Sequence, residues 1–312
     1  MTARRVVVAG GAGFIGSHVC DWMLAAGDEV VAVDNMLTGG RANVAHLVDR
    51  PGFSLMERDV CEPVVIDGPV DAVLHLASPA SPRDFAVMPL EILAVGSLGT
   101  RQLLELARAK SARFLVMSTS EVYGDPLEHP QVETYRGNVN PIGPRSCYDE
   151  AKRFAEALTM AYHRHYGVTV RIARVFNTYG PRMKPGDGRV VSNFLVQALS
   201  GAPITVYGDG SQTRSFCYID DEVAGLLALL DGPVTGPVNI GNPDEFTIAE
   251  LADLVIELTG SRSAIVREPL PVDDPVRRRP DITLARTQLG WEPRVPLRDG
   301  LARTADWLRT VL

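Results

Sequence analysis

A glycine-rich turn near the N-terminus constrains the fold of this chain more than any other feature. The apolar run of residues 6–9 leads directly into Gly10-Gly11-Ala12-Gly13-Phe14-Ile15-Gly16. Glycines at this spacing lack the Cβ atoms that would block a tight turn, and they let a pyrophosphate approach the amides at a helix N-terminus. We therefore expect a buried strand at 5–9, a helix at 15–26 and a phosphate-binding turn between them.

Short apolar segments alternate with longer helical ones through the first half of the chain. The pattern predicts strands at 29–34, 70–76 and 114–118 and helices at 89–109 and 148–166. This alternation favours an α/β fold, a Rossmann-type doubly wound parallel sheet. Beyond residue 176 proline and glycine become frequent, and 237–241 is typical of a strand that returns to the first sheet.

This change in composition beyond residue 176 predicts two domains. We expect a dinucleotide-binding domain made of residues 1–179 and 218–242. A smaller α/β domain that binds the substrate is expected at 180–217 and 243–312.

Composition excludes several classes of partner. A formal net charge of -7 and a pI near 5.4 argue against nucleic acid. The longest apolar runs are too short to cross a bilayer, and the N-terminal run continues into the glycine turn rather than a signal-peptide cleavage site. The four cysteines have no metal or redox spacing, so we expect no metal, reduced thiols and a cytoplasmic location.

A tyrosine and a lysine four residues apart suggest a catalytic base. Tyr148 and Lys152 project from one face of the predicted helix. A free phenol has a pKa of about 10. A nearby ammonium, together with the positive nicotinamide of an oxidised dinucleotide, favours the phenolate. Taken alone, this spacing more often belongs to two surface residues of a helix. The glycine turn upstream favours the interpretation as a catalytic pair.

An acidic residue ends the second predicted strand. Asp34 can accept hydrogen bonds from both ribose hydroxyls of NAD and would repel the 2′-phosphate of NADP. The alternative is a solvated turn residue. By the same topology, Asp59 and Val60 at the end of the third strand region are expected near the adenine.

Strings along nearly the whole chain resemble the extended short-chain dehydrogenase/reductases that act on nucleotide sugars. The closest resemblance is to the UDP-glucuronate decarboxylases, or UDP-xylose synthases. Besides the glycine turn, Asp34 and the Tyr148–Lys152 pair, the resemblance rests on residues 74–82 (LHLASPASP), 118–126 (STSEVYGDP), 137–145 (GNVNPIGPR), 176–183 (FNTYGPRM), 187–194 (DGRVVSNF), 207–214 (YGDGSQTR) and 274–281 (DPVRRRPD).

The resemblance implies a set of residues for NAD and a set for the sugar nucleotide. The residues implied for NAD are Gly10, Gly13, Phe14, Ile15, Gly16, Asp34, Asn35, Met36, Leu37, Thr38, Gly39, Asp59, Val60, Leu76, Ser78, Tyr148, Lys152, Thr178 and Arg189. Those implied for the substrate are Asn177, Arg189, Asn193, Tyr207, Gln212, Arg214 and Arg278. The run at 277–279 could instead be a solvated face, but Arg278 aligns best with a catalytic-site arginine of the family.

The implied reaction begins with UDP-glucuronate. Tyr148 takes the proton of the sugar 4-hydroxyl while C4 gives its hydride to NAD, and the 4-keto uronic acid then loses CO₂ to leave an enolate. Return of the hydride gives UDP-xylose and regenerates NAD. Thr119 is expected to bind the 4-oxygen, Lys152 to hold the nicotinamide ribose, and Glu121 to handle protons or water near C5. Arginine at 278 suits recognition of a carboxylate or phosphate.

Other functions on the same scaffold stay open. Sugar 4,6-dehydratases place Asp-Glu after the threonine, whereas this chain has Ser120 before Glu121, and 4-epimerases generally lack a carboxylate at that position. The alternatives are a nucleotide-sugar 4-epimerase or other isomerase, and a non-catalytic NAD-binding regulator, which would need neither Tyr148 nor Lys152. The family also implies a homodimer formed through helices 89–109 and 148–166.

One segment departs from the family. Ala94, Val95 and Gly96 stand where its members typically carry Lys-Thr-Asn. Because a cationic substrate contact and two polar groups are lost, we expect the closed complex to loosen and some UDP-4-keto-pentose to be released.

Overall fold

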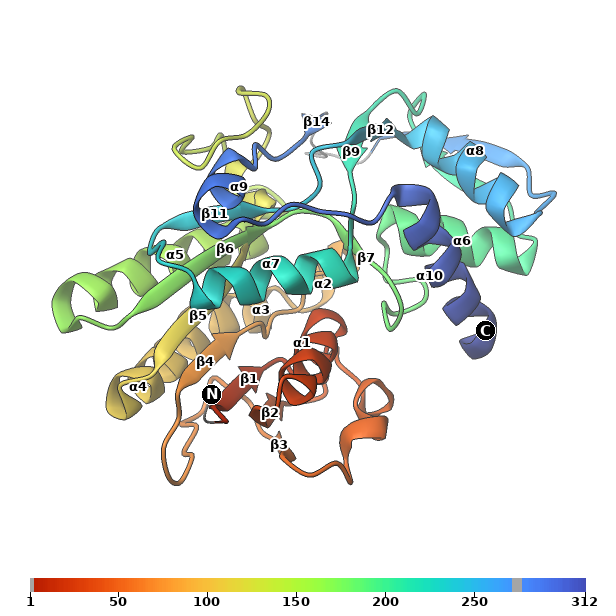
Figure 1. Cartoon of the computed structure of the whole chain (residues 1–312). Helices are drawn as coiled ribbons and strands as arrows, with labels where there is room; N and C mark the ends of the chain where they lie inside the picture. The colour runs from red at the N-terminus through yellow and green to blue at the C-terminus, as the bar shows by residue number, and fades with distance from the viewer. Residues whose placement is uncertain (1–2, 271–276) are drawn as a thin grey trace.

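A seven-stranded parallel sheet forms the main body of the computed structural model, which describes residues 3–270 and 277–312 (Figure 1). Residues 274–276 of the string at 274–281 lie outside the described residues. The strand order is β11–β6–β5–β4–β1–β2–β3. The strands of this sheet are β1 (Arg5–Ala9), β2 (Glu29–Asp34), β3 (Phe53–Glu57), β4 (Ala72–His75), β5 (Arg113–Thr119), β6 (Val170–Val175) and β11 (Pro237–Ile240). The predicted doubly wound α/β fold is confirmed, and the strand expected at 237–241 pairs with β6.

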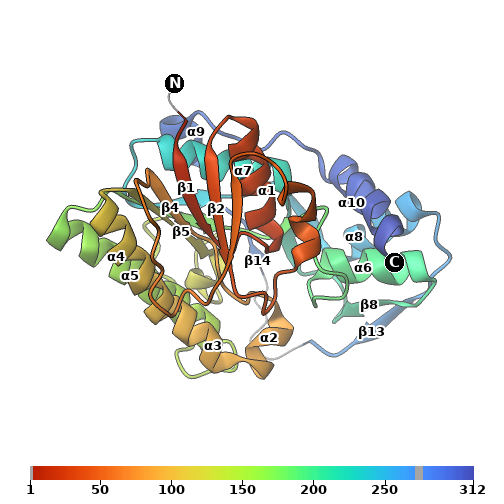
Figure 2. The ribbon, with the colours of Figure 1, turned by 90° about the horizontal axis from the view of Figure 1, so that it is seen from below.

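Helices cover both faces of the sheet because its central strands, such as β1 and β4, bury residues on both of their sides, whereas the edge strand β3 is partly exposed. In β1, Val6 and Val8 pack with residues of α1 (Phe14–Ala25) and α7 (Ile219–Asp231). Val7 and Ala9 instead pack with α4 (Thr100–Lys110) and α5 (Ser146–Tyr166). Figure 2 shows the two helical layers on opposite sides of the strands. Uninterrupted apolar strands of this kind are typical of a parallel sheet buried on both faces.

The order of the strands creates a crevice between β1 and β4. From β1 the chain first adds β2 and β3 on one side, and it then crosses to β4, β5 and β6 on the other. The loops that leave β1 and β4 therefore separate, and ligands of open α/β sheets bind at such a switch point beyond the carboxyl ends of the strands.

Smaller sheets and three helices lie to the right of the main sheet in Figure 1. Their elements are β7 (Thr178–Tyr179), α6 (Val190–Ser200), β8 (Ile204–Tyr207), β9 (Thr213–Ser215), β10 (Cys217–Tyr218), β12 (Glu245–Thr247), α8 (Ile248–Thr259), β13 (Ile265–Glu268), β14 (Arg277–Arg278) and α10 (Leu297–Val311). A further helix, α9 (Thr283–Leu289), packs near β11. The two-domain division given above stays a prediction. In the described part of the chain, no helix has the length and apolarity of a membrane span.

The helical stretch expected at 89–109 is confirmed, but a widened turn interrupts its α-helical geometry. Helices α2 (Pro82–Val87) and α3 (Pro89–Ala94) are followed by a π-helical turn, η3 (Val95–Gly99), and only then by α4. Hydroxyl groups satisfy carbonyls around the turn: Ser97 Oγ donates to Leu93 O at 2.6 Å, and Thr100 Oγ1 donates to Gly96 O at 2.8 Å. π turns of this kind occur frequently at functional sites.

The widened turn brings the chain against α5. A Cβ atom added to Gly96 would lie 2.6 Å from Ala151 Cβ and 2.9 Å from Ala151 O. No side chain fits at this contact, so the glycine is required by the approach of the two segments. The asparagine that the family resemblance implies at this position is therefore replaced by direct packing.

We predict that Gly96→Asn lowers the free energy of unfolding by about 1–3 kcal/mol, the usual cost of overpacking. Ala151→Gly removes the methyl group that an added side chain meets first, so Gly96→Asn should cost less in an Ala151→Gly background. Urea unfolding of the wild type, both single variants and the double variant measures this coupling. Additive effects of the two changes would show that the contact does not constrain position 96.

Candidate active site

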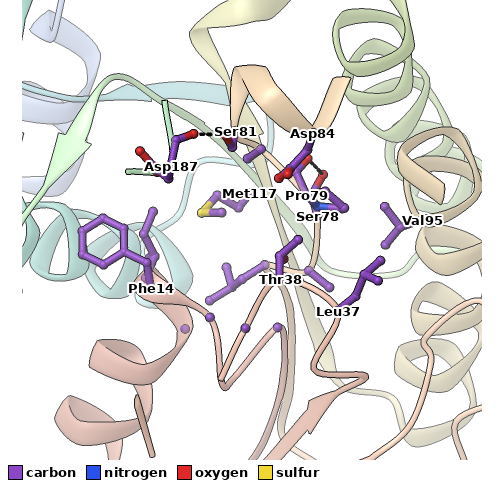
Figure 3. A pocket seen from close by; sticks show the side chains of 18 of the residues that line it. Phe14, Leu37, Thr38, Ser78, Pro79, Ser81, Asp84, Val95, Met117 and Asp187 are labelled. Carbon is purple, nitrogen blue, oxygen red and sulfur yellow. Dashed lines mark hydrogen bonds between the residues drawn. The ribbon is translucent and has the colours of Figure 1, made fainter. Parts of the chain in front are cut away.

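A cavity of about 690 Å³ lies at the carboxyl ends of the central strands. Figure 3 shows Phe14 of the glycine turn, Leu37 and Thr38 after β2, and Val95 of the π turn around it. Most of the residues predicted to bind the two ligands line this cavity. They are Gly10, Gly13, Phe14, Ile15, Gly16, Asp34, Asn35, Leu37, Thr38, Gly39, Asp59, Val60, Leu76, Ser78, Thr119, Glu121, Tyr148, Asn177, Thr178 and Arg189.

The remaining predicted residues do not line the cavity. Lys152 lies buried one turn after Tyr148 on α5, and Met36 follows Asp34 with a left-handed φ of 61°. The residues assigned to the substrate lie on or beside α6, β8, β9 and β14. They are Asn193, Tyr207, Gln212, Arg214 and Arg278. Within this group Gln212 Nε2 donates to Tyr207 O at 2.7 Å. Their roles in binding stay predictions.

The glycine turn has the geometry that a diphosphate requires. Gly10 has a φ of 81°, and a Cβ atom there would lie 2.7 Å from the backbone nitrogen of Ala77. A Cβ atom on Gly16 would lie 2.0 Å from Gly10 O. Gly13 is the N-cap of α1, no side chain caps the helix, and the first residues of α1 line the cavity, so the helix N-terminus that could bind a phosphate lies in the cavity wall.

A fixed carboxylate stands beside these amides at the end of β2. Asp34 accepts hydrogen bonds from Ala12 N at 3.0 Å and from Met36 N at 2.9 Å. Burial raises the pKa of Asp34, and the two amides counteract part of that rise. Amides for a pyrophosphate and a carboxylate for ribose hydroxyls fit a dinucleotide. Asn35 Nδ2 donates to Asp59 at 3.0 Å and so joins the ends of the second and third strands.

Tyr148 lies in the cavity wall between Thr119 and an aromatic ring. Its ring stacks on Phe85, with centroids 4.9 Å apart and an interplanar angle of 18°. Burial raises the pKa of Tyr148 to about 12. The charge of Arg189 and a hydrogen bond with Thr119 lower it in part. The phenol is therefore protonated at neutral pH in the protein alone, and a lower pKa beside an oxidised nicotinamide stays a prediction.

Lys152 lies behind the tyrosine. Its Nζ is 5.6 Å from the centroid of the Tyr148 ring and donates to Met117 O at 3.0 Å. Burial lowers the pKa of Lys152 to about 8. The helical spacing thus places tyrosine and lysine together as predicted, with the ammonium held by the end of β5.

Glu121 is held between two arginines. It lies on η4 (Ser120–Tyr123), the short helix that follows Thr119. Arg145 Nη2 lies 2.7 Å from its Oε2, and Arg278 Nη1 donates to its Oε1. Burial works against the charged form, but Arg278 and Arg145 outweigh it and lower the pKa of Glu121 to about 2. The carboxylate is therefore ionised at every physiological pH.

Two residues of the site, Arg145 and Phe85, were not identified from the sequence. Arg145 lines the cavity, and its guanidinium carbon lies 5.4 Å from the centroid of the Phe85 ring. Phe85 is the ring that covers Tyr148. The spacing of three residues between Arg145 and Tyr148 is one helical turn, and this signal could have identified the arginine. Arg278, by contrast, is buried behind Glu121 and donates to Gly124 O at 3.1 Å.

A loop of residues 180–189 forms another wall of the cavity and is tied to the segment before α2. Ser81 Oγ donates to Asp187 O, as Figure 3 shows. Arg83 Nη1 donates to Gly186 O at 2.6 Å, and Arg189 Nη2 donates to Ala80 O at 3.0 Å. At the other end of the loop, Arg182 pairs with Asp21 of α1.

Comparisons with known proteins agree with this site. A profile of the NAD dependent epimerase/dehydratase family matches residues 6–241. UDP-glucuronic acid decarboxylase 1 of Arabidopsis thaliana is 55% identical over 305 residues, which are 98% of this chain and 70% of that protein. UDP-glucuronic acid decarboxylase 1 of Danio rerio is 52% identical over 304 residues, 97% of this chain and 72% of that protein. The chain therefore spans about 70% of the length of these relatives.

A solved structure shows the same fold with ligands bound. UDP-glucuronic acid 4-epimerase from Bacillus cereus, in complex with UDP-glucuronic acid and NAD, superposes with a TM-score of 0.87. It is 27% identical, and the match covers 99% of this chain and 100% of that one. Together with the sequence relatives, this likeness shows that the chain belongs to the NAD-dependent epimerase/dehydratase family and, within it, to the UDP-glucuronic acid decarboxylases.

Proposed function

We propose that this chain converts UDP-glucuronate to UDP-xylose and CO₂ with tightly held NAD. One observation carries the proposal: an ionised Glu121, paired with two arginines, lies in the same cavity as the Thr119–Tyr148 pair and the glycine turn. Oxidation at C4 needs the tyrosine, and loss of CO₂ needs a site for a carboxylate close by. Names of the sequence relatives support the same reaction.

In this proposal Tyr148 and Thr119 act at C4 of the sugar, and Glu121 acts beside the carboxylate on C5. Tyr148 and Thr119 bind the 4-oxygen, and Tyr148 accepts the hydroxyl proton. NAD, when bound, accepts the hydride from C4 and later returns it. At the 4-keto stage the bond from C5 to the carboxylate breaks, and its electron pair moves into the C4–C5 enolate. Hydrogen bonds from Thr119 and the Tyr148 hydroxyl stabilise the resulting oxyanion.

Glu121 promotes the loss of CO₂ electrostatically. A sugar carboxylate that enters beside Glu121 shares its arginines and is repelled by its charge. This repulsion disappears as the carboxylate leaves as neutral CO₂. A permanently ionised Glu121 therefore destabilises the bound acid relative to the transition state, which lowers the barrier.

Asp34 sets the choice of dinucleotide in this proposal. Two backbone amides hold its carboxylate in the cavity wall, where a 2′-phosphate would place a second negative group against it. NAD dependence belongs to the family, and preference for NAD over NADP is the finer step that Asp34 supports.

The proposal includes a cytoplasmic homodimer. Exposed apolar side chains on α3, the π turn and α5 support a subunit interface there, namely Leu90, Leu93, Leu98 and Phe154. Sedimentation equilibrium is expected to return twice the chain mass of 33.8 kDa. A single-chain mass across micromolar concentrations would contradict the dimer.

We predict that purified protein supplied with UDP-glucuronate and NAD releases CO₂ and forms UDP-xylose, as read by mass spectrometry. Ala94 and Val95 line the cavity where polar groups were implied, so part of the product should be UDP-4-keto-pentose, matched by free NADH. Tyr148→Phe keeps the stacked ring and should slow turnover by a factor on the order of 10²–10⁴. A hexuronic acid product of unchanged mass would instead identify a 4-epimerase, and no turnover with NAD bound would leave a regulator.

Glu121→Gln separates the two halves of the reaction. The amide keeps the shape and removes the charge that repels the substrate carboxylate, so CO₂ release should fall more than the initial reduction of NAD. Equal slowing of both steps would assign Glu121 to oxidation rather than decarboxylation. Arg278→Ala is expected to act in the same direction because Arg278 is the strongest charge that keeps the buried Glu121 ionised, and its loss disfavours the charged form of Glu121.

We predict that Asp34→Ala narrows the preference of the protein for NAD over NADP. Removing the carboxylate removes both the ribose acceptor and the repulsion of a 2′-phosphate. Fluorescence titration with NADH and NADPH gives the two dissociation constants for each protein. Asn43→Ala, which changes a nearby cavity residue without altering charge, is the matched control. Tighter binding of NADPH by the wild type would refute the role of Asp34.

A further inference from the structure

A buried carboxyl group beside the Glu121 cluster has no part in the steps above. Asp149 follows Tyr148 in the first turn of α5, and 5% of its surface is exposed. Among residues 3–270 and 277–312, its Oδ1 has no hydrogen-bond partner, and neither does the buried Nε of Arg278. A buried acceptor and a buried donor left unsatisfied within one group of charges are costly, so such atoms are seldom retained without a use.

The charges that act on Asp149 come from three directions. Glu121 belongs to η4 and Arg278 to β14, while Arg145 and Glu150 flank Asp149 in the sequence. Burial, followed by the charge of Glu121, raises the pKa of Asp149 to about 7, and the two arginines oppose this rise. The group can therefore gain or lose its proton near neutral pH.

Other ionisable groups near this part of α5 belong to the site itself. Tyr148 and Lys152 share the helix, and α3, which packs against it, contributes Glu91 to the cavity wall. The charge of Asp149 raises the pKa of Tyr148, so an ionised Asp149 also opposes formation of the phenolate. Both the base and the carboxylate end of the site therefore work best when Asp149 is neutral.

The proton on Asp149 changes the charge of the cluster that would receive the sugar carboxylate. With Asp149 protonated, the cluster of Glu121, Arg145 and Arg278 is one charge more positive than with Asp149 ionised. That proton compensates the single negative charge of an incoming sugar carboxylate. With Asp149 ionised, binding adds the carboxylate without this compensation, and a buried uncompensated charge is strongly disfavoured.

We propose that Asp149 is a positioning residue for the uronate: it acts through Arg145 and Arg278, and takes up a proton from solvent when the sugar carboxylate binds. This inference rests on the proposed function in that the ligand is a uronic acid. It assigns to the residue after the catalytic tyrosine the task of matching the charge of the site to that of the substrate.

The proposal distinguishes UDP-glucuronate from UDP-glucose, which has the same nucleotide and no carboxylate. Above the pH at which Asp149 ionises, binding of UDP-glucuronate must recruit one proton, so its dissociation constant should rise up to about tenfold per pH unit. Below that pH the constant should be flat. UDP-glucose should lack the part of this dependence that comes from Asp149, whereas any contribution from Lys152 would be common to both ligands.

Isothermal titration calorimetry of the wild type with NADH bound, which cannot accept the hydride and so prevents turnover of the ligand, tests the proposal without a variant. Between pH 6 and 9, UDP-glucuronate binding in two buffers of different ionisation enthalpy should reveal net proton uptake, which approaches about one proton per site at the upper end. UDP-glucose should show an uptake smaller by up to about one proton, because any titration of Lys152 is common to both ligands. Equal proton uptake for the two ligands, or uptake for neither, would overturn the inference.

Asp149→Asn keeps the shape of the side chain and cannot ionise. Its affinity for UDP-glucuronate should be independent of pH over this range, and at pH 9 it should bind tenfold or more tightly than the wild type. Glu150→Gln is the matched control, since it removes a half-exposed carboxylate from the same turn, and it should retain the wild-type pH dependence. An Asp149→Asn variant with the wild-type pH profile would refute the assignment.

The two proposals fail in different ways. CO₂ release from UDP-glucuronate combined with pH-independent binding would leave the decarboxylase standing and remove the role of Asp149. Failure to bind UDP-glucuronate at any pH, with NAD bound normally, would instead remove the proposed function.

Discussion

An ion pair between α5 and β6 holds the parts of the active site in their relative positions. Glu156 of α5 accepts from Arg174 of β6 at 2.8 and 2.9 Å, and from Ser118 Oγ at 2.6 Å. Arg174 also donates to the hydroxyl of Tyr123, in the short helix that carries Glu121. Three elements therefore meet at one carboxylate. The pair is partly exposed, so removing one partner should cost less than the roughly 3–5 kcal/mol typical of a fully buried pair.

This arrangement explains how distant segments can form one precise cluster. The catalytic helix is fixed to β5 at two levels, by Glu156 and, one turn earlier, by the bond from Lys152 to Met117 O. Thr119 and Glu121 follow from the same strand, so their distance from the tyrosine is set by the sheet. From the smaller sheets, β14, which pairs with β9, places Arg278 against Glu121. The charge balance of the cluster thus depends on contacts between segments more than 150 residues apart in the chain.

Local patterns predicted the parts of the fold that depend on local physics. The strands at 5–9 and 29–34, the glycine turn and the Tyr148–Lys152 spacing are determined by side-chain periodicity and by the absence of Cβ atoms. The π turn could not be predicted in this way, because it depends on the approach of Ala151 to Gly96. Arg145 and Arg278 lie in strings of comparable strength, and both pair with Glu121. Their different positions depend on the fold, since Arg145 at the start of α5 lines the cavity while the pairing of β14 with β9 holds Arg278.

The π turn between α3 and α4 also fixes the length of its segment. A turn of this type accommodates one residue more than an α-helical turn, and each residue of a helix rotates the chain by about 100°. Deleting one residue from 95–99 would restore an uninterrupted helix but turn α3 by that angle relative to α4. Ala94 would then rotate away from the cavity and Leu93, now half exposed, would take up a different direction. A change of length in this segment would thus redirect a whole helical face, and in this the segment resembles a strand register rather than a surface loop.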